Sequence, residues 1–308
     1  MGFHILTTKL RDMLTHTLCL LLTIIFLAGI LVCASPAANK KSTINNRNKA
    51  RAVAEKVIEA MGGWESWKST RYLRFSFFGF RTHYWDKDTG RYRVSWTDRR
   101  SGHSQVILMN LNSKKGKVYT DGIEVTDVKT RDQFLERARR AWINDTYWLL
   151  MPYKLFDPGV ELTYSGEEVI NGTTYDILHL SFNDVGVTPG DEYWAYINRE
   201  TSLMDKWVYL LQLREGQTER SRGEWKWNSW RRYGKILLSS ERERVDGQKR
   251  MHKDLAVFQH VDKVVFTSWS PVTPKLLYEH TDLDISEKAE EATSSYIPVT
   301  SKPAKQLD

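Results

Sequence analysis

The sequence predicts an α+β fold built mainly from antiparallel β-strands, and three observations indicate it. A helical apolar stripe at 47–61 ends in two glycines, and a strand pattern follows at once. Most of the remaining chain alternates apolar and polar residues between turn residues, with one more helical segment in the middle. We count roughly ten or eleven strands, which we expect to curl toward a barrel because closure removes exposed strand edges.

The first 34 residues have the pattern of a signal peptide. The apolar run at 18–32 has about the length of a signal-peptide core and is short for a membrane span. Cleavage after Ala34 would leave a polar spacer at 35–46. Lipid attachment at Cys33 and retention of the segment as an uncleaved anchor are the alternatives. In each case the protein is exported.

Both cysteines lie in this segment, so a chain cleaved after Ala34 has no thiol and no disulfide, and a hydrophobic core must hold it. The formal net charge is +7, and removal of Lys9, Arg11 and Asp12 with the signal leaves +6. For an exported protein, anionic lipid or polysaccharide fits this charge better than nucleic acid, and ordinary solubility explains it as well. We therefore expect no nucleic-acid partner.

The chain from 47 to 283 is long enough for one large domain, and we expect a monomer. Residues 284–308 contain few side chains that could be buried, which is typical of a disordered tail.

The first helix is expected at 47–61, with Gly62 and Gly63 supplying a left-handed stop. Trp64 and Trp67 follow directly, and we interpret them as a hydrophobic plug under the end of the helix. Strands are then predicted from period-two alternation and turn residues, the strongest hairpin being centred on Asn171 and Gly172. They are expected at 72–80, 91–96, 104–111, 117–120, 161–170, 173–182, 192–197, 203–210, 235–245, 249–258 and 263–269.

A central helix is predicted at 131–148, because Phe134, Ala138, Ala141 and Trp142 recur at helical spacing. The segment 147–153 that follows is the most apolar part of the chain outside the signal peptide.

The order of these predicted elements resembles that of the LolA/LolB-like lipoprotein-carrier superfamily, and in particular that of its outer membrane lipoprotein-sorting-like envelope branch. The similar segments are Ala-Glu-Lys-Val-Ile-Glu-Ala-Met-Gly-Gly at 54–63, Asp-Glu-Tyr-Trp-Ala-Tyr-Ile-Asn at 191–198 and Leu-Met-Asp-Lys-Trp at 203–207. The resemblance covers about residues 46–260 and rests on apolar spacing and turns.

The resemblance implies an incomplete, half-open antiparallel barrel with helices over its mouth, in a protein of the periplasm or cell envelope. In that family the cavity takes the acyl chains of lipoproteins, so a lipid or other hydrophobic molecule, and envelope lipoproteins, are the implied partners. The central helix would form the lid. The expected ligand-binding residues of cavity and lid are Phe75, Phe77, Tyr92, Trp96, Trp142, Trp148, Leu149, Leu150 and Met151.

A second hypothesis concerns the stretch 220–235, where basic residues interleave with three tryptophans. Arginine and tryptophan together suit anionic headgroups or sugars, so this stretch could bind an anionic glycan or a membrane surface. The alternative is a strand with its tryptophans in the core and its basic face in water. The candidate residues are Arg220, Arg222, Lys226, Arg231 and Arg232.

No catalytic signature accompanies these features in the sequence. There is no Gly-x-Ser-x-Gly elbow, no glycine-rich phosphate loop and no histidine pair at metal-binding spacing. The acidic pairs at 167–168 and 191–192 are adjacent on strands and point to opposite faces, so neither is a natural acid/base couple. We therefore expect a protein without catalytic activity, cofactor or metal. A hydrolase with carboxylates assembled by folding is the remaining alternative.

Overall fold

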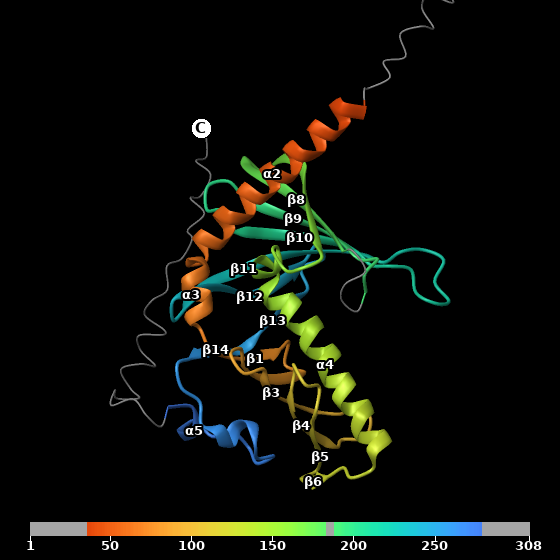
Figure 1. Ribbon diagram of the computed structural model, residues 1–308, viewed down its shortest axis with the longest axis vertical. Helices are drawn as coiled ribbons and strands as arrows, with labels where there is room; N and C mark the ends of the chain where they lie inside the picture. Colours follow the sequence, from red (N-terminus) through yellow and green to blue (C-terminus); the bar gives the residue numbers. More distant parts are fainter. Residues whose placement is uncertain (1–35, 183–187, 279–308) are drawn as a thin grey trace, which may run out of the picture. The chain divides into compact units, whose positions relative to one another are not determined.

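The structure is a computed structural model that describes residues 36–182 and 188–278 (Figure 1). The predicted signal peptide with Cys33 and the predicted tail at 284–308 lie outside these residues. The chain divides into two units, Met1–Asn45 and Asn46–Asp308. Of the first unit, the structure describes residues 36–45, which belong to helix α2 (Pro36–Ala60). Every described strand belongs to the second unit.

The second unit contains two antiparallel sheets of seven strands each. The first sheet has the order β14-β1-β2-β3-β4-β5-β6. Its strands are β1 (Tyr72–Phe77), β2 (Arg81–Asp86), β3 (Arg91–Thr97), β4 (Ser104–Asn110), β5 (Gly116–Thr120), β6 (Ile123–Glu124) and β14 (Lys253–Phe258).

The second sheet has the order β13-β12-β11-β10-β9-β8-β7, so it is a meander of hairpins. Its strands are β7 (Val160–Ile170), β8 (Thr173–Phe182), β9 (Glu192–Asn198), β10 (Met204–Leu210), β11 (Arg222–Tyr233), β12 (Ile236–Arg244) and β13 (Lys249–Met251). The predicted fold class is confirmed: the architecture is mainly antiparallel β, and neither sheet closes into a barrel within the described residues.

The two seven-stranded sheets contain more strands than the expected ten or eleven, and two of the differences have a local cause. The predicted strand at 72–80 ends at Phe77, and a turn with Phe78 and Gly79 at positive φ leads into β2. The predicted strand at 249–258 divides at His252 into β13 and β14, which pair with different sheets. The chain thus returns from the second sheet to the first at a single residue.

Helix α2 begins at Pro36, so residues 36–46, expected as a spacer, are helical. Proline is favourable in the first helical turn, and no further proline or glycine interrupts the segment. As predicted, the helix stops at Gly62, whose φ is 110°. A Cβ atom there would lie 2.4 Å from the carbonyl oxygen of Lys235, so the helix end sits directly on the turn before β12.

Helix α3 (Gly63–Ser69) carries both tryptophans of the predicted plug. Trp67 stacks on Tyr153 with 4.3 Å between ring centroids, and Trp64 meets Phe156 edge to face. Both tryptophans pack against the main core, which confirms the plug. That core is formed by α2, β1 and the inner faces of β8 to β12.

The predicted last strand at 263–269 is wrong. Residues Lys263–Phe266 form the 3-10 helix η2, which precedes the short helix α5 (Lys275–Tyr278). The carbonyl groups of Val265, Ser268 and Trp269 accept hydrogen bonds from the buried guanidinium of Arg93. In a strand these carbonyls would accept hydrogen bonds from the backbone of a neighbouring strand. Here they accept them from the side chain of Arg93 on β3.

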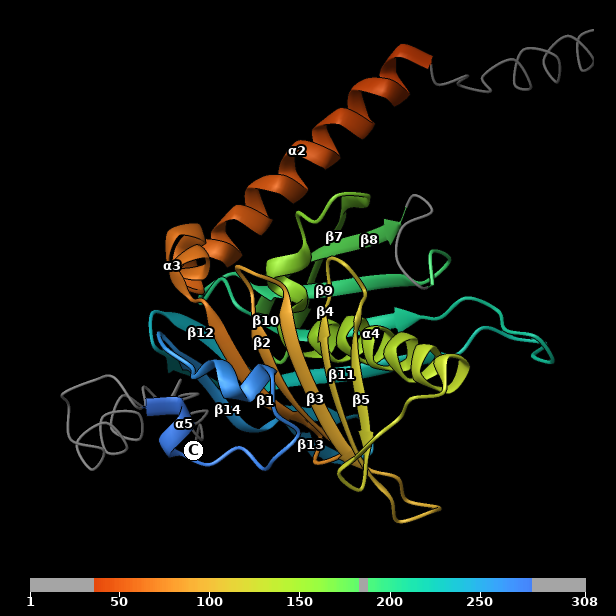
Figure 2. The ribbon, with the colours of Figure 1, turned by 60° about the horizontal axis from the view of Figure 1, so that its bottom comes forward.

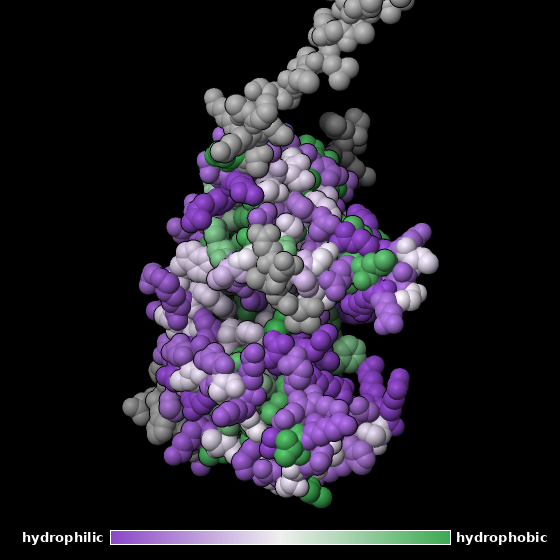
Figure 3. Space-filling view, turned by 45° about the vertical axis from the view of Figure 1, so that its right-hand side comes forward, coloured by the Kyte–Doolittle hydropathy of each residue, from purple (hydrophilic) through white to green (hydrophobic). Residues whose placement is uncertain are grey.

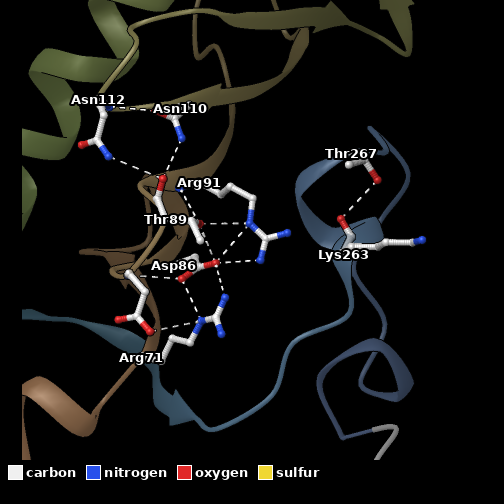
Figure 4. Close-up of polar contacts among 9 residues, drawn as sticks. Arg71, Asp86, Thr89, Arg91, Asn110, Asn112, Lys263 and Thr267 are labelled. Atoms are coloured by element: carbon white, nitrogen blue, oxygen red, sulfur yellow. Dashed lines mark hydrogen bonds and ion pairs between the residues drawn. The ribbon is translucent and has the colours of Figure 1, made fainter.

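A buried carboxylate holds the turn between β2 and β3 (Figure 4). The side chain of Asp86 is inaccessible to solvent and accepts hydrogen bonds from Arg71 Nε at 3.0 Å, Arg91 Nη2 at 2.7 Å and Thr89 Oγ1 at 2.7 Å. Burial acts to raise the pKa of Asp86, but the hydrogen bonds from Arg71, Arg91 and Thr89 outweigh it and hold the pKa well below its ordinary value.

Candidate ligand-binding cavity

Helix α4 (Val128–Leu150) is the central helix of the sequence prediction, and it contacts both sheets. It packs on β4 and β5 of the first sheet and on β12 of the second (Figures 1 and 2). Asp127 caps its first turn by accepting a hydrogen bond from the backbone N–H of Thr130 at 2.8 Å. The 3-10 helix η1 (Met151–Lys154) continues from its last residue into the core.

A cavity of about 640 Å³ lies beside the C-terminal half of α4. Eight of its 22 lining residues are aromatic, and their rings come from four strands as well as from the helix. The space-filling view in Figure 3 shows hydrophobic side chains in separate groups among the hydrophilic side chains of one face. The aromatic residues of the wall are Trp96, Trp142, Tyr147, Trp148, Phe182, Tyr193, Trp207 and Tyr209.

These rings contact one another across the helix–sheet boundary. Trp148 meets Trp207 edge to face with 4.8 Å between ring centroids, and Tyr147 lies 5.2 Å from Tyr193. Tyr193 in turn lies 5.3 Å from Trp207. Burial raises the pKa of Tyr147 well above its ordinary value, so its hydroxyl is neutral at physiological pH. The aromatic side chains at this end are therefore uncharged, and the hydroxyl of Tyr193 donates a hydrogen bond to Asp191 Oδ2 at 3.4 Å.

Helix α4 is tied to the first sheet by a buried acid. Asp145 is fully buried and receives two hydrogen bonds from Arg81 of β2, at 2.7 and 2.8 Å. Its Oδ2 also lies 2.9 Å from Nε2 of His83 on the same strand. Burial acts to raise the pKa of Asp145, but hydrogen bonds from His83 and Arg81 outweigh it, so the pKa lies below its ordinary value.

His83 continues this contact to β3. Its Nδ1 lies 2.7 Å from the hydroxyl oxygen of Tyr92. Burial lowers the pKa of His83 in spite of the opposing effect of Asp145, so the ring is neutral at pH 7. A proton on Nε2 faces Asp145 and leaves Nδ1 to accept the hydrogen bond from Tyr92, which assigns the tautomer. All three side chains are fully buried, so the array connects the helix to the sheet and has no opening to a substrate.

A buried arginine of the second sheet, Arg242, donates hydrogen bonds to the same helix. The Nη2 of Arg242, on β12, donates to the backbone carbonyl of Trp148 at 2.6 Å, and its Nη1 donates to Ser239 Oγ at 2.7 Å. The guanidinium carbon also lies 3.3 Å from the ring centroid of Trp227. Arg242 thus caps a carbonyl in the last turn of α4, where helix carbonyls have no partner within the helix.

The rim of the cavity is basic. Five lining residues are cationic and two are acidic. The charge of Arg81 is matched by Asp145, and Lys154 Nζ lies 2.7 Å from Asp157 Oδ2. Three other cations, Arg137, Arg140 and Arg214, are exposed at the rim.

The structure separates the predicted ligand-binding residues into two groups. Trp96, Trp142 and Trp148 line the cavity. The other six are buried in hydrophobic core and do not line it: Phe75, Phe77, Tyr92, Leu149, Leu150 and Met151.

The sequence interpretation did not assign Phe182, Tyr193, Trp207 and Tyr209, which complete the wall from the second sheet. Tyr193 and Trp207 lie in the segments quoted for the family resemblance, and Trp207, Tyr209 and Leu211 alternate along one face of β10 and its continuation. This alternation is the sequence pattern that could have identified these residues as part of one wall.

The basic stretch at 220–235 lies mainly in β11, with Trp225 and Trp227 buried in the core. Its cations have carboxylate or carbonyl partners: Arg220 Nη1 lies 2.7 Å from Glu192, Arg222 pairs with Glu224, and Lys226 Nζ lies 3.2 Å from Glu243. Arg231 and Arg232 are exposed, and Arg232 donates to the carbonyl of Lys235. The arrangement matches the alternative of a core-facing tryptophan strand with a solvated, internally paired basic face.

Within residues 36–182 and 188–278, no group of three His, Cys, Asp or Glu side chains is placed to hold a metal ion. Among the helices of these same residues, none combines the length and apolar character needed to cross a bilayer.

The similarity expected from the sequence is found in solved structures. A LolA superfamily protein from Nitrosomonas europaea superposes with a TM-score of 0.38 at 12% identity, covering 70% of this chain and 96% of that one. A DUF1329 family protein from Desulfovibrio piger gives 0.38 at 10% identity, with 70% and 96% covered. An outer membrane lipoprotein-sorting protein domain from Vibrio parahaemolyticus gives 0.36 at 8% identity, with 72% and 97% covered. No family model and no curated protein sequence matches the chain.

Proposed function

We propose that the protein is an exported cell-envelope protein that binds a lipid or other hydrophobic ligand in the cavity beside α4, in a carrier or lipoprotein-sorting-like role. The observation that carries the proposal is the aromatic cavity itself. Its volume of about 640 Å³ falls within the ~300–1,000 Å³ that is typical of small-molecule sites. Rings from both a helix and a sheet form its wall, so a ligand there would be held between two independent elements.

The polar groups next to this cavity support binding rather than catalysis. Asp145, His83 and Tyr92 are fully buried and already occupied with one another. Arg81 reaches the wall, but both of its hydrogen bonds to Asp145 are made. A general acid or base must reach the substrate within hydrogen-bond distance, and these groups are arranged to position the helix.

The proposal is tested by filling the cavity. Ala141 lies on the wall, in α4, so Ala141→Trp would occupy the space that a ligand needs. We expect this variant to bind a neutral naphthylamine dye at least about tenfold more weakly than the wild type, since most of a bound ligand's surface is buried in such a site. Dye fluorescence, which rises in apolar surroundings, measures the affinity.

The matched control is Gln133→Trp, which adds the same ring at an exposed position of the same helix, outside the cavity wall. We expect it to bind the dye as the wild type does. Wild-type affinity in a folded Ala141→Trp variant would contradict the proposal, and so would an equal loss in both variants.

A further inference from the structure

The charge of the residues that line the cavity changes from one end of the cavity to the other. Along α4 the lining residues change from arginine to tryptophan: Arg137 and Arg140 are exposed, whereas Trp148 is half-buried. With a rise of 1.5 Å per residue, Arg140 and Trp148 are separated by about 12 Å along the helix axis. Along this helix the wall therefore changes from exposed arginines, with Trp96 against Arg137, to the half-buried Trp148.

The wall formed by the second sheet shows the same change from aromatic residues to an exposed arginine. Trp207, Tyr209 and Leu211 line the cavity from β10 and its continuation, and Arg214 follows in the loop between β10 and β11. Trp207 is almost fully buried, at 1% exposure, while Arg214 is exposed. Two elements that are distant in sequence thus both change from buried aromatic to exposed arginine along the same cavity.

The charges at this end are poorly compensated within the described residues. Arg140 and the side chain of Arg214 make no ion pair or hydrogen bond there that would neutralise them. Glu136, one turn before Arg140, is engaged by Arg139 in two hydrogen bonds of 2.8 Å each. Arg137 Nη2 lies 3.9 Å from Asp98 Oδ2, and its guanidinium carbon lies 4.9 Å from the ring centroid of Trp96.

Two acidic residues line the same cavity, against three exposed arginines. Asp157 is paired with Lys154. Asp191 Oδ1 accepts the backbone N–H of Gln212 at 2.7 Å, and its side chain is almost fully buried. The rim near Arg140 and Arg214 is therefore left with positive charge that a bound anion could satisfy.

We propose that the ligand is an anionic amphiphile, with its apolar chain against the aromatic wall and a phosphate or carboxylate head on Arg140 and Arg214. This inference rests on the proposed function, because it specifies the ligand of the same cavity. Arginine suits such a head because its planar guanidinium donates two parallel hydrogen bonds to phosphate or carboxylate oxygens. A neutral ligand would offer neither arginine a charged partner.

The test compares two probes that share one chain: dodecyl phosphate and the neutral dodecyl maltoside, each below its micelle-forming concentration. Their affinities for the full chain are measured by tryptophan fluorescence. We expect dodecyl phosphate to bind more tightly, and the double variant Arg140→Gln, Arg214→Gln to weaken it roughly tenfold. The same variant should leave dodecyl maltoside within about twofold of the wild type. Arg140→Lys in the presence of Arg214 should retain most of the preference, because the charge remains.

The matched control is Lys129→Gln, which removes an exposed cation of the same helix that does not line the cavity. It should leave both affinities unchanged. Equal affinity for the two probes would overturn the inference while leaving the proposed function standing, whereas failure of both probes to bind would overturn both. An equal effect of Lys129→Gln would show a general charge effect and overturn the inference. If inorganic phosphate bound as tightly as dodecyl phosphate, the inference of an amphiphile would be overturned, because a free anion would explain the binding.

Discussion

Buried charges in this protein are stabilised in two different ways. Asp86 and Asp145 each face arginine side chains, so an opposite charge compensates for the loss of water. Arg242 is equally buried but bonds to carbonyls, a hydroxyl and the face of Trp227. Neutral acceptors and an aromatic face thus take the place of a carboxylate at this position.

The contribution of Asp86 should depend on pH in a defined direction. Its pKa is lower in the folded protein than the ordinary value of 3.8, so its stabilisation is present above about pH 4 and is lost as the pH falls further. At pH 7 we expect Asp86→Asn to reduce the free energy of unfolding by about 1–3 kcal/mol, because two arginines lose their charged acceptor.

Urea denaturation of wild type and Asp86→Asn at pH 7 and pH 3 measures this effect. The difference between the two proteins should be smaller at pH 3, where Asp86 of the unfolded chain binds a proton while the folded carboxylate, with its lowered pKa, does not. A difference that is the same at both pH values would contradict the assigned role of the carboxylate.

At the level of single residues, the sequence predicted burial better than it predicted which residues line the cavity. Alternation correctly placed Phe75 and Phe77 on an inner face of β1. Whether an inner face meets core or cavity depends on which distant element covers it, and alternation carries no information on that. For this reason Trp96 lies on the cavity wall, whereas Phe75 and Tyr92 lie in the hydrophobic core.

Helix α4 is the element that joins the two sheets. Asp145 bonds it to β2 of the first sheet, and the carbonyl of Trp148 bonds it to Arg242 of the second. The two attachments are three residues apart, so they fix the last turns of the helix directly beside the cavity wall. The position of the aromatic wall therefore depends on polar contacts that are not themselves part of it.

We expect Arg242→Met to lower the free energy of unfolding by about 1–3 kcal/mol, because the carbonyl of Trp148 loses its buried donor. Hydrogen-exchange protection in the last turn of α4 should fall more than protection in β1. The control is Arg244→Met on the same strand, where the arginine is 44% exposed and pairs with Asp246. Its effect should stay within about 0.5 kcal/mol. Equal losses in the two variants would contradict the attachment.

The elements themselves were largely predictable, since helix 131–148 corresponds to α4 and the hairpin at Asn171 and Gly172 corresponds to β7–β8. Failures occurred where a long-range contact overrode a local pattern. The apolar residues at 263–266 form a 3-10 helix because Asp262 caps it and Arg93 binds the following carbonyls. Sequence distance hides such a contact, because Arg93 lies about 170 positions earlier in the chain.

For the molecule as a whole, the second unit combines two open sheets with one helix that contacts both. The predicted mainly antiparallel, unclosed architecture is confirmed, but the division into two seven-stranded sheets was not foreseen. The chain passes from the first sheet to the second through α4 and returns at His252, where the flanking sequence resembles one continuous strand. The cavity arises from this arrangement and so could not be located from any one segment.

The central claim, that the cavity holds a hydrophobic ligand, is tested most directly by mass spectrometry of the purified full chain, measured natively and again after organic extraction. We predict close to one bound molecule per wild-type chain, released by extraction as a lipid or other amphiphile, and absent from Ala141→Trp. A folded wild-type chain that carries no ligand and also fails to take up the neutral dye would contradict the claim.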